Sequence, residues 1–335
     1  MVRWKLAATA FLLASSPSVA QVITHVHTDS TSEPVDTHTQ AQEVGFKNDG
    51  RDRMTVPVTV GGSGPFRFMV DTGADRTVVS RQLAGRLQLA AGPGGQLHSV
   101  TGVSPVRTVT VRQLQLSNRT IGRIDAPVLE ADHMGAEGIL GTDSLGTQRV
   151  LFDFKNQRLS ITPAQRRRQK DEAGTIVVQA SRRAGRLILT EAEADDQRLT
   201  VVLDTGSEVS IGNAALKRAL TSRRLLQRNG QIDLISVTGQ TLTGDYMFVK
   251  QLEIGGVALT NLAIVFADAH TFRQMKLEER PALLLGMNAL KAFEQVSIDF
   301  ANRRMRVRAP KESGLPGAQL ASVSGAARPP SWPAR

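Results

Sequence analysis

The sequence of 335 residues contains no cysteine, so neither disulfide bonds nor thiolate metal ligands can contribute to its structure. Stability must therefore come from packed hydrophobic cores. A chain of this length can bury one large core or two modest ones, because a typical domain takes roughly 100–200 residues. Two lobes are the better expectation.

Tyrosine and tryptophan are scarce, with one Tyr and two Trp in the whole chain. These residues offer little for stacking on nucleic-acid bases, although the formal net charge is +10. The basic residues gather in short clusters at expected linkers and strand ends, where a solvated surface is a simpler explanation than an anionic partner. We therefore expect no nucleic-acid partner.

No apolar run approaches the roughly 20 residues that a membrane-spanning helix needs. The predominantly apolar segment Leu6–Ala14 follows Arg3 and Lys5 and precedes the small residues Ser18–Ala20, which is the pattern of a secretory signal peptide. We predict a signal peptide over residues 1–20 that is cleaved near Ala20. The sequence thus predicts a secreted or periplasmic protein with no integral membrane segment after removal of the signal.

Polar segments divide the remainder of the chain. Residues 21–50 lack apolar periodicity, which predicts a flexible leader or propeptide. The charged residues 166–174 predict a basic linker between an N-terminal lobe at 51–165 and a C-terminal lobe at 175–309. The proline-rich residues 310–335 predict a disordered tail.

Four short motifs occur twice and in the same order, once in each predicted lobe. The pairs are Asp71-Thr72-Gly73 with Asp204-Thr205-Gly206, Ser99–Gly102 with Ser236–Gly239, Ile139–Gly141 with Leu284–Gly286, and Leu151–Phe154 with Ser297–Phe300. Self-similarity at so long a period indicates duplicated domains, because solenoid repeats have periods of about 20–50 residues. The second copy is longer, and we expect much of the added length in Asp268–Arg280, as a loop or short helix.

Strand patterns dominate both copies. Val56, Val58 and Val60 alternate with other residues, and apolar runs at 66–70 and 198–203 end directly before the two Asp-Thr-Gly motifs. Short helices are predicted at residues 81–89, 142–146, 213–226 and 287–294. The sequence therefore predicts an all-β chain with a few short helices.

An Asp that follows a buried strand is held where the chain turns. The next Thr can hydrogen-bond to neighbouring backbone or to a facing loop, and the Gly permits backbone geometry that other residues resist. A single Asp-Thr-Gly motif would be interpreted as an Asx-turn, in which the Asp only satisfies local amides. Two copies with matching Gly motifs favour two carboxylates brought together by a duplicated fold.

These motifs resemble those of the pepsin and retropepsin class of aspartic proteases. In that family each lobe contributes Asp-Thr-Gly followed by Ala or Ser, matched here by Asp71-Thr72-Gly73-Ala74 and Asp204-Thr205-Gly206-Ser207. Two hydrophobic residues and a Gly cross behind each loop, matched by Ile139–Gly141 and Leu284–Gly286. The resemblance covers roughly residues 51–309. It implies a bilobal all-β fold with two β-barrel-like, retropepsin-like lobes in one chain.

The resemblance also implies an aspartic-type endopeptidase that hydrolyses peptides or unfolded proteins. Asp71 and Asp204 would share one proton, because two carboxylates a few ångströms apart cannot both ionise easily; the aspartic-protease dyad is the standard example of this effect. The ionised member would take a proton from a bound water, and the protonated member would hydrogen-bond the substrate carbonyl. No metal, cofactor or covalent intermediate is implied.

The same resemblance assigns roles to neighbouring residues. Thr72 and Thr205 would cross-link the two Asp loops. Two hairpin tips occupy the family's flap position, where a hairpin closes over substrate, and the alternative is that they are ordinary hairpins. The flap candidates are Val100, Thr101, Gly102, Val237, Thr238 and Gly239. Pepsin-type flaps carry a Tyr in the first lobe, but the only Tyr here is Tyr246 in the second, for which a core or strand position is expected. His98 is expected to be a surface or strand residue.

The two Asp loops differ in the residue after the glycine. The hydroxyl of Ser207 can donate to the carboxylate of Asp204, whereas Ala74 offers Asp71 nothing equivalent. This difference predicts that Asp204 is the more acidic member and that Ser207→Ala raises the lower limb of the pH profile.

Two alternatives remain beside a monomeric enzyme. The chain could be a catalytically silent peptide-binding module of the same fold, although intact Asp, Thr and Gly in both motifs favour catalysis. It could instead form an intermolecular dimer whose dyads combine loops from two chains. Duplication within one chain makes a monomer with pseudo-two-fold symmetry the simpler expectation.

Overall fold

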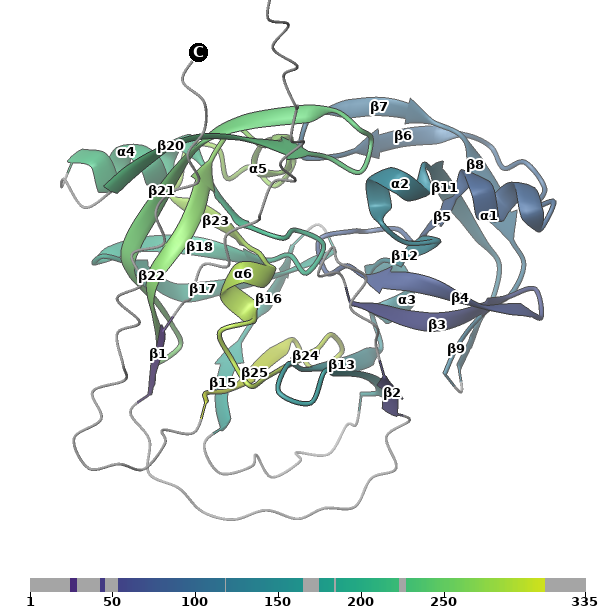
Figure 1. Ribbon diagram of the computed structural model, residues 1–335, viewed down its shortest axis with the longest axis horizontal. Helices are drawn as coiled ribbons and strands as arrows, with labels where there is room; N and C mark the ends of the chain where they lie inside the picture. Colours follow the sequence, from purple (N-terminus) through teal and green to yellow (C-terminus); the bar gives the residue numbers. More distant parts are fainter. Residues whose placement is uncertain are drawn as a thin grey trace, which may run out of the picture. The chain divides into compact units, whose positions relative to one another are not determined.

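Strands make up most of the chain, as predicted. The computed structural model describes residues 25–28, 43–45, 54–117, 119–164, 175–183, 185–222 and 227–310 (Figure 1). The helices among them are short, from four residues in α2 (Ala131–Met134) to nine in α4 (Ala214–Ser222). The predicted all-β class is confirmed, and so are the two lobes, each of which has its own large sheet.

The two large sheets repeat one arrangement of four strands. In the first, β12 (Gly138–Leu140) is parallel to β4 (Ser63–Val70) and antiparallel to β5 (Val78–Ser80), and β5 is parallel to β11 (Ile124–Leu129). In the second, β23 (Ala282–Leu285), β18 (Gln197–Leu203), β19 (Ser210–Gly212) and β22 (Val257–Phe266) pair in the same way. The predicted duplication is therefore visible as a repeated topology.

The other strands extend these two sheets. The first sheet also contains β3 (Thr55–Val60), β8 (Thr108–Val111), β9 (Leu114–Leu116) and β10 (Arg119–Ile121). The second also contains β1 (His25–Thr28), β16 (Ser181–Arg183), β17 (Arg186–Ala194), β20 (Gln227–Ile235) and β21 (Thr241–Ile254). All four residues of β23 are buried, which explains its continuous apolar sequence, since a strand covered on both faces does not alternate.

A third sheet of six strands joins the lobes. Its order is β15 (Thr175–Gln179), β25 (Arg304–Arg308), β24 (Gln295–Asp299), β13 (Gln148–Asp153), β14 (Arg158–Pro163) and β2 (Glu43–Gly45). Strands β13 and β24 are antiparallel, and Leu151 lies opposite Ser297, its counterpart in the fourth repeated motif. A turn explains the Asp of this motif. Asp153 Oδ1 accepts from the Asn156 N–H, and Asp299 Oδ1 accepts from the Asn302 N–H, both at 2.9 Å.

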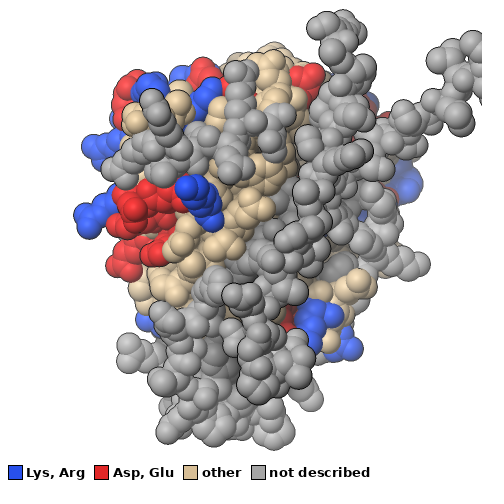
Figure 2. Space-filling model, turned by 60° about the vertical axis from the view of Figure 1, so that its left-hand side comes forward, with Lys and Arg blue, Asp and Glu red and all other residues tan. Residues whose placement is uncertain are grey.

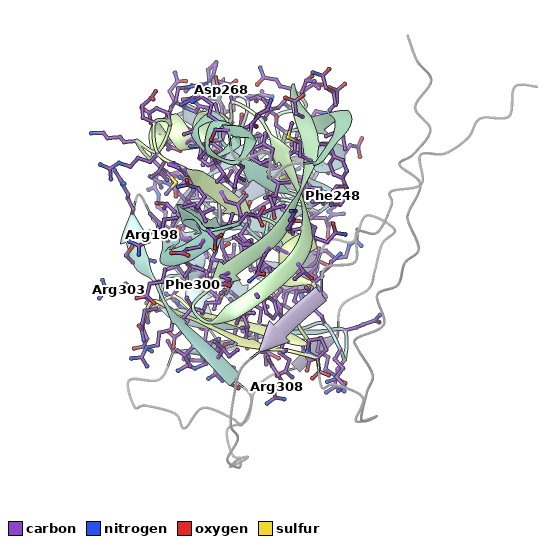
Figure 3. The ribbon with its side chains drawn as sticks, turned by 90° about the vertical axis from the view of Figure 1, so that its left-hand side faces the viewer. Arg198, Phe248, Asp268, Phe300, Arg303 and Arg308 are labelled. Carbon is purple, nitrogen blue, oxygen red and sulfur yellow. The ribbon has the colours of Figure 1, made fainter. Side chains whose placement is uncertain are left out.

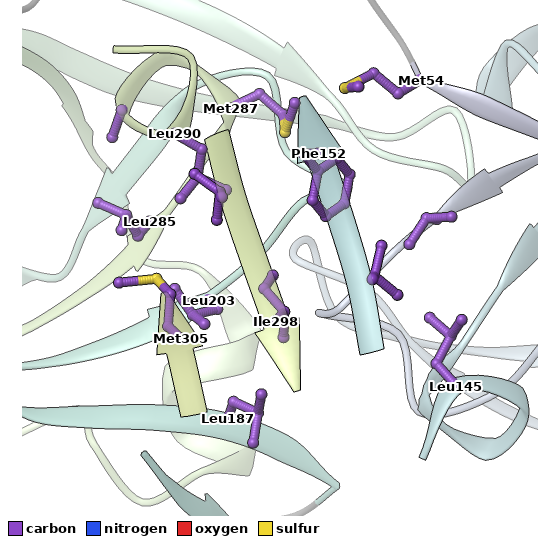
Figure 4. Packing of buried hydrophobic residues seen from close by; sticks show 14 of the residues in the cluster. Met54, Leu145, Phe152, Leu187, Leu203, Leu285, Met287, Leu290, Ile298 and Met305 are labelled. Carbon is purple, nitrogen blue, oxygen red and sulfur yellow. The ribbon is translucent and has the colours of Figure 1, made fainter. Parts of the chain in front are cut away.

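One hydrophobic cluster runs through this junction into both lobes. It includes Phe152 of β13, Ile298 of β24 and Leu203 of β18, all at most 1 % exposed. Figure 4 shows Phe152 and Ile298 at different heights on two adjacent strands, with Leu145 on the side of Phe152 and Leu203 on the side of Ile298. Because burial of each such side chain contributes about 1.5–3 kcal/mol, the core can stabilise the chain without disulfides.

Charged side chains form local pairs on the described surface. Lys155 Nζ lies 2.8 Å from Glu294 Oε1, and Arg273 Nη1 lies 2.6 Å from Asp268 Oδ2. In the view of Figure 2, Asp and Glu side chains gather in one group with Lys and Arg side chains at its border. Exposed pairs contribute about 0–1 kcal/mol each, so these charges add little to the stability of the core.

Three of the four predicted helices begin at the predicted residue and end earlier, whereas α4 begins one residue later than predicted, at Ala214. Helix α1 (Arg81–Arg86) stops before Leu89, because Gln88 adopts a left-handed backbone with φ of 49°. Helix α3 (Thr142–Leu145) and helix α6 (Met287–Leu290) each form a single turn after the third repeated motif. The predicted insertion at Asp268–Arg280 contains helix α5 (His270–Gln274), at the position that α2 has in the first lobe.

The segment predicted as a flexible leader differs from that prediction at two places. Strand β1 pairs with the edge of β22, and β2 pairs with the edge of β14. Edge strands carry unpaired backbone groups that an added strand satisfies. The signal-peptide residues 1–20, the basic linker and residues 311–335 of the tail lie outside the described residues. Within the described part, no helix has the length and apolar character needed to span a membrane.

Candidate active site

Asp71 and Asp204 each follow the inner end of a central strand. Only the last three residues of β4, Phe68–Val70, are buried, so this strand enters the core immediately before Asp71. The Asp71 N–H donates to the carbonyl of Leu140 at 3.1 Å, and the Asp204 N–H donates to that of Leu285 at 3.1 Å. The backbone of each Asp is therefore fixed by the strand that carries the third repeated motif.

The hydrophobic-Gly motif, Ile139–Gly141 in the first lobe and Leu284–Gly286 in the second, packs against the backbone that follows each Asp loop. Its Gly141 lies against the backbone of Arg76, where a Cβ atom would come within 2.5 Å of the carbonyl carbon. Gly286 has the same relation to Val209, also at 2.5 Å. Because no side chain fits at this distance, both positions require glycine.

Two further polar pairs support the loops and were missed from the sequence. Thr77 donates its N–H to Asp143 Oδ1 at 2.9 Å and accepts the Gly141 N–H at 3.2 Å. Ser210 donates its N–H to Asn288 Oδ1 at 2.8 Å and accepts the Gly286 N–H at 3.1 Å. Thr77 and Ser210 occupy equivalent positions in the two lobes, and so do Asp143 and Asn288. The residue types differ between the lobes, so the sequence shows no repeated letters at these positions.

Four reciprocal hydrogen bonds join the two Asp loops. The Thr72 hydroxyl donates to the Leu203 carbonyl at 2.9 Å and accepts the Thr205 N–H at 3.1 Å. The Thr205 hydroxyl donates to the Val70 carbonyl at 2.9 Å and accepts the Thr72 N–H at 3.0 Å. Both threonines are buried, and this is the cross-link that the sequence predicts.

Replacing Thr72 by Val is expected to lower the free energy of unfolding by about 2 kcal/mol, because the Leu203 carbonyl and the Thr205 N–H lose their buried partner. Thr72→Ser keeps the hydroxyl and is the matched control. Urea unfolding of both variants measures the difference. Equal stability of the Val and Ser variants would contradict this role of the hydroxyl.

Asp71 is buried and Asp204 is partly buried, and their carboxyl groups lie close enough for each to shift the pKa of the other. Gly73 lies against the Asp204 carboxylate, where a Cβ atom would be 2.6 Å from Oδ1, and Gly206 lies against the Asp71 carboxylate in the same way. The structure thus brings together both predicted Asp residues and the glycines of both motifs.

Backbone donors hold each carboxylate in place. Asp71 Oδ1 accepts from the N–H groups of Gly73 at 2.7 Å and Ala74 at 3.1 Å. Asp204 Oδ1 accepts from the Gly206 N–H at 3.1 Å. These donors favour the ionised state of each carboxyl, as they do wherever a carboxylate accepts amide hydrogen bonds.

Burial and mutual repulsion act against that ionised state. Burial, followed by the charge of Asp204, raises the pKa of Asp71 to about 7. Burial also raises the pKa of Asp204, but the cation of Arg186, the Gly206 and Ser207 amides and the hydrogen bond from Asp71 oppose this rise. The two carboxyls therefore titrate as a coupled pair that holds on to a proton more strongly than an isolated Asp does.

The predicted role of Ser207 is not what the geometry gives. Its hydroxyl donates to the carbonyl of Val209 at 2.7 Å and not to the carboxylate of Asp204. The reason given for an effect of Ser207→Ala on the pH profile is therefore removed. Within Ser207, it is the backbone N–H and not the hydroxyl that favours ionisation of Asp204. Ala74 provides an equivalent backbone N–H to Asp71.

The two predicted flap segments are hairpin tips that meet each other. The first connects β6 (Gly95–His98) with β7 (Val103–Val106), and the second connects β20 with β21. The Thr101 hydroxyl donates to Gln240 Oε1 at 2.8 Å, and the Thr238 hydroxyl donates to the same oxygen at 3.3 Å. Figure 1 shows the two hairpins converging along the upper edge of the ribbon.

Each tip also packs on the opposite lobe. Val100 contacts the hydrophobic cluster of the second lobe around Phe272, and Val237 contacts that of the first lobe around Met134. The positive φ angles of Gly102 (150°) and Gly239 (81°) allow the chain to turn at both tips. The six flap candidates therefore lie in two crossed contacts between lobes.

His98 is an exposed strand residue, as predicted, but it also contacts the second lobe. Its Nδ1 lies 3.0 Å from Nε2 of His270, and the two rings stack with centroids 5.3 Å apart. The His270 N–H donates to the carbonyl of Val100 at 2.8 Å. Tyr246 lies in β21 with its ring edge-to-face to Phe248, so its predicted strand position is confirmed.

Replacing His98 by Gln is expected to raise the pKa of His270. Partial burial, the charge of His98 and the charge of Arg273 lower this pKa, whereas Asp268 raises it. The variant removes the second of these causes, so His270 should titrate at higher pH, as measured by NMR of its ring Cε1–H. His133→Gln, in α2 of the same lobe as His98, is the control. An unchanged His270 titration in His98→Gln would contradict the contact.

Comparison with known proteins identifies one family. The sequence profile described as aspartyl protease matches the chain twice, at residues 56–144 and 190–289. Each match contains one Asp-Thr-Gly motif and the hydrophobic-Gly motif behind it. A search of curated protein sequences gives no significant match. The described residues contain no group of three or more His, Asp or Glu side chains that could hold a metal ion.

Proposed function

Because this chain belongs to the aspartyl protease family, we propose that it is an aspartic endopeptidase whose catalytic residues are Asp71 and Asp204. The observation that carries the proposal is that each carboxyl group lies against the glycine of the opposite Asp loop, with both loops held by backbone amides and by the Thr72 and Thr205 cross-link. A carboxyl pair that retains one proton has both an acid and a base for hydrolysis.

In the proposed reaction, the ionised Asp204 takes a proton from a water bound between the carboxyl groups. The water oxygen attacks the carbon of the scissile peptide carbonyl, and Asp71 donates its proton to the carbonyl oxygen. The resulting tetrahedral diol collapses as Asp204 delivers its proton to the leaving nitrogen and Asp71 regains the proton from a hydroxyl. The C–N bond breaks, water is consumed, and the dyad returns to its starting state.

The substrate class follows from the flap contacts. Two hairpins whose tips meet across the lobes are suited to enclosing an extended peptide segment and excluding water from it. We propose peptides or unfolded proteins as substrates. The signal-peptide pattern of residues 1–20 supports an exported enzyme, and both Asp loops come from one chain, which supports a monomer.

The energetic cost of the dyad argues against a silent peptide-binding module. Burial raises the pKa of both carboxyls, and the charge of Asp204 raises that of Asp71 further, so the fold makes both groups harder to ionise. Peptide binding alone does not need two such carboxyl groups. Perturbed carboxyls of this kind gather at catalytic sites.

Purified protein incubated with casein, a disordered substrate, tests the proposal across pH 3–8. Cleavage is expected to require acid or neutral conditions and to fall as pH rises through about 7, because Asp71 then loses the proton that it must donate. A statine-type transition-state analogue should block it. Binding of casein fragments without cleavage at any pH would favour the silent module, and gel filtration would reveal a dimer.

A further inference from the structure

Arg186 is a buried cation that crosses from the second lobe to the Asp71 loop. It is the first residue of β17 and is 5 % exposed. Its Nε donates to the carbonyl of Gly73 at 2.7 Å, and Nη1 donates to Gln274 Oε1 at 3.3 Å. The guanidinium is thus bonded directly to the loop that carries Asp71.

The backbone beside Arg186 is fitted closely to the first lobe. Gly185 has a φ of 78°, and a Cβ atom there would be 2.8 Å from Asp75 Oδ1 and 3.4 Å from Thr142 Oγ1. The turn that precedes β17 therefore cannot move away from the Asp71 loop without losing this fit. The position of Arg186 follows from the backbone as well as from its own hydrogen bonds.

Asp75 neutralises this cation only in part. Its Oδ2 lies 3.6 Å from Arg186 Nη2, beyond hydrogen-bond distance, and its side chain is 37 % exposed against 6 % for Arg186. Solvent therefore screens the negative charge more than the positive one. Uncompensated positive potential remains beside the dyad, and Arg186 lowers the pKa of both Asp71 and Asp204.

We propose that Arg186 is a cross-lobe positioning residue, which holds the Asp71 loop through the Gly73 carbonyl and stabilises the negative charge of the dyad. The proposal rests on the proposed function, since it assigns Arg186 a part in maintaining the ionised member of the pair. A guanidinium suits this place because its planar set of donors can satisfy the Gly73 carbonyl and the Gln274 amide together. Its positive charge offsets part of the cost that burial adds to ionising the two carboxyls.

The decisive measurement is the titration of the two dyad carboxyls by ¹³C NMR on full-length protein labelled at the Asp carboxyl carbons. Arg186→Gln is expected to move the dyad titration upward by about one pH unit, because a nearby opposite charge shifts a pKa by roughly 1–3 units. The acid limb of the cleavage profile should shift in the same direction. Arg186→Lys keeps the charge, so its dyad should titrate close to that of the wild type.

A second variant changes the same balance in the opposite direction. Asp75→Asn removes the partial counter-charge of Arg186, so the dyad should titrate at lower pH than in the wild type. This variant also tests the proposal if Arg186→Gln does not fold. Arg198→Gln is the charge control: Arg198 pairs with Glu193, is 90 % exposed and lies at the periphery in Figure 3. Arg198 precedes Asp204 by six positions along an extended strand, which corresponds to about 20 Å.

Unchanged dyad titration in both Arg186→Gln and Asp75→Asn would overturn the proposal, as would an equal shift in Arg198→Gln. A shift in Arg186→Gln that Arg186→Lys does not reduce would also overturn it, since charge would then not be the cause. NMR reads the carboxyls whether or not the protein cleaves substrate. Wild-type protein that never cleaves casein would contradict the proposed function and leave the titration comparison valid.

Discussion

Asparagine in place of either Asp71 or Asp204 is expected to reduce casein cleavage by roughly 1,000-fold, within the range that general acid–base groups contribute. The amide in Asp71→Asn cannot donate the proton that the carbonyl oxygen needs, and the amide in Asp204→Asn cannot accept one from water. The two single variants should lose activity to a similar degree, because acid and base act together in the same addition step. Initial rates of cleavage at the wild-type pH optimum measure the effect.

Stability measurements separate this loss from unfolding. Folding raises the pKa of Asp71 from 3.8 to about 7, so the native state binds more protons than the unfolded state in this window. Stability of the wild type therefore falls as pH rises from about 4 to about 7. Asp71→Asn removes this cost, and the variant should be more stable than the wild type at pH 7. Cleavage retained by either Asn variant would contradict a shared dyad.

The sequence predicts the geometry of the two Asp loops well because each constraint there depends on residue type. Only glycine fits at Gly141 and Gly286, where a Cβ atom would meet backbone, and only a hydroxyl can both donate and accept at Thr72 and Thr205. Such positions repeat as identical or similar letters in both copies. The fold class follows for the same reason, since buried central strands such as β23 need continuous apolar residues.

Contacts between side chains far apart in the sequence were not predictable in this way. One short-range contact was mispredicted as well: the Ser207 hydroxyl had the right chemistry to reach Asp204, three residues earlier, but the local turn directs it to the carbonyl of Val209. Arg186 belongs to no repeated motif, and its role depends on a lobe crossing that only the folded chain creates. His98 is similar, because its partner His270 lies 172 positions away in the second lobe.

Alanine in place of Gly73 is expected to reduce cleavage by about 100-fold. The new Cβ atom would lie 2.6 Å from Asp204 Oδ1, whereas carbon and oxygen atoms normally approach no closer than about 3.3 Å. The carboxyl groups must then separate by a sizeable fraction of an ångström, and a misplacement of about 1 Å can cost a hundredfold in rate. Gly206→Ala should behave alike, since its Cβ atom would meet the Asp71 carboxylate. Steady-state cleavage of casein measures both variants.

Gly85→Ala is the matched control for this prediction. Gly85 lies in α1, and a Cβ atom there has no other atom within 4 Å, so the variant should retain full activity and gain up to about 1 kcal/mol of stability. Neither Gly73 nor Gly206 has a positive φ, which means that alanine suits the backbone at both sites. A loss in their variants would therefore come from contact with the opposite carboxylate. Full activity in Gly73→Ala would show that the dyad tolerates wider spacing than the proposed reaction allows.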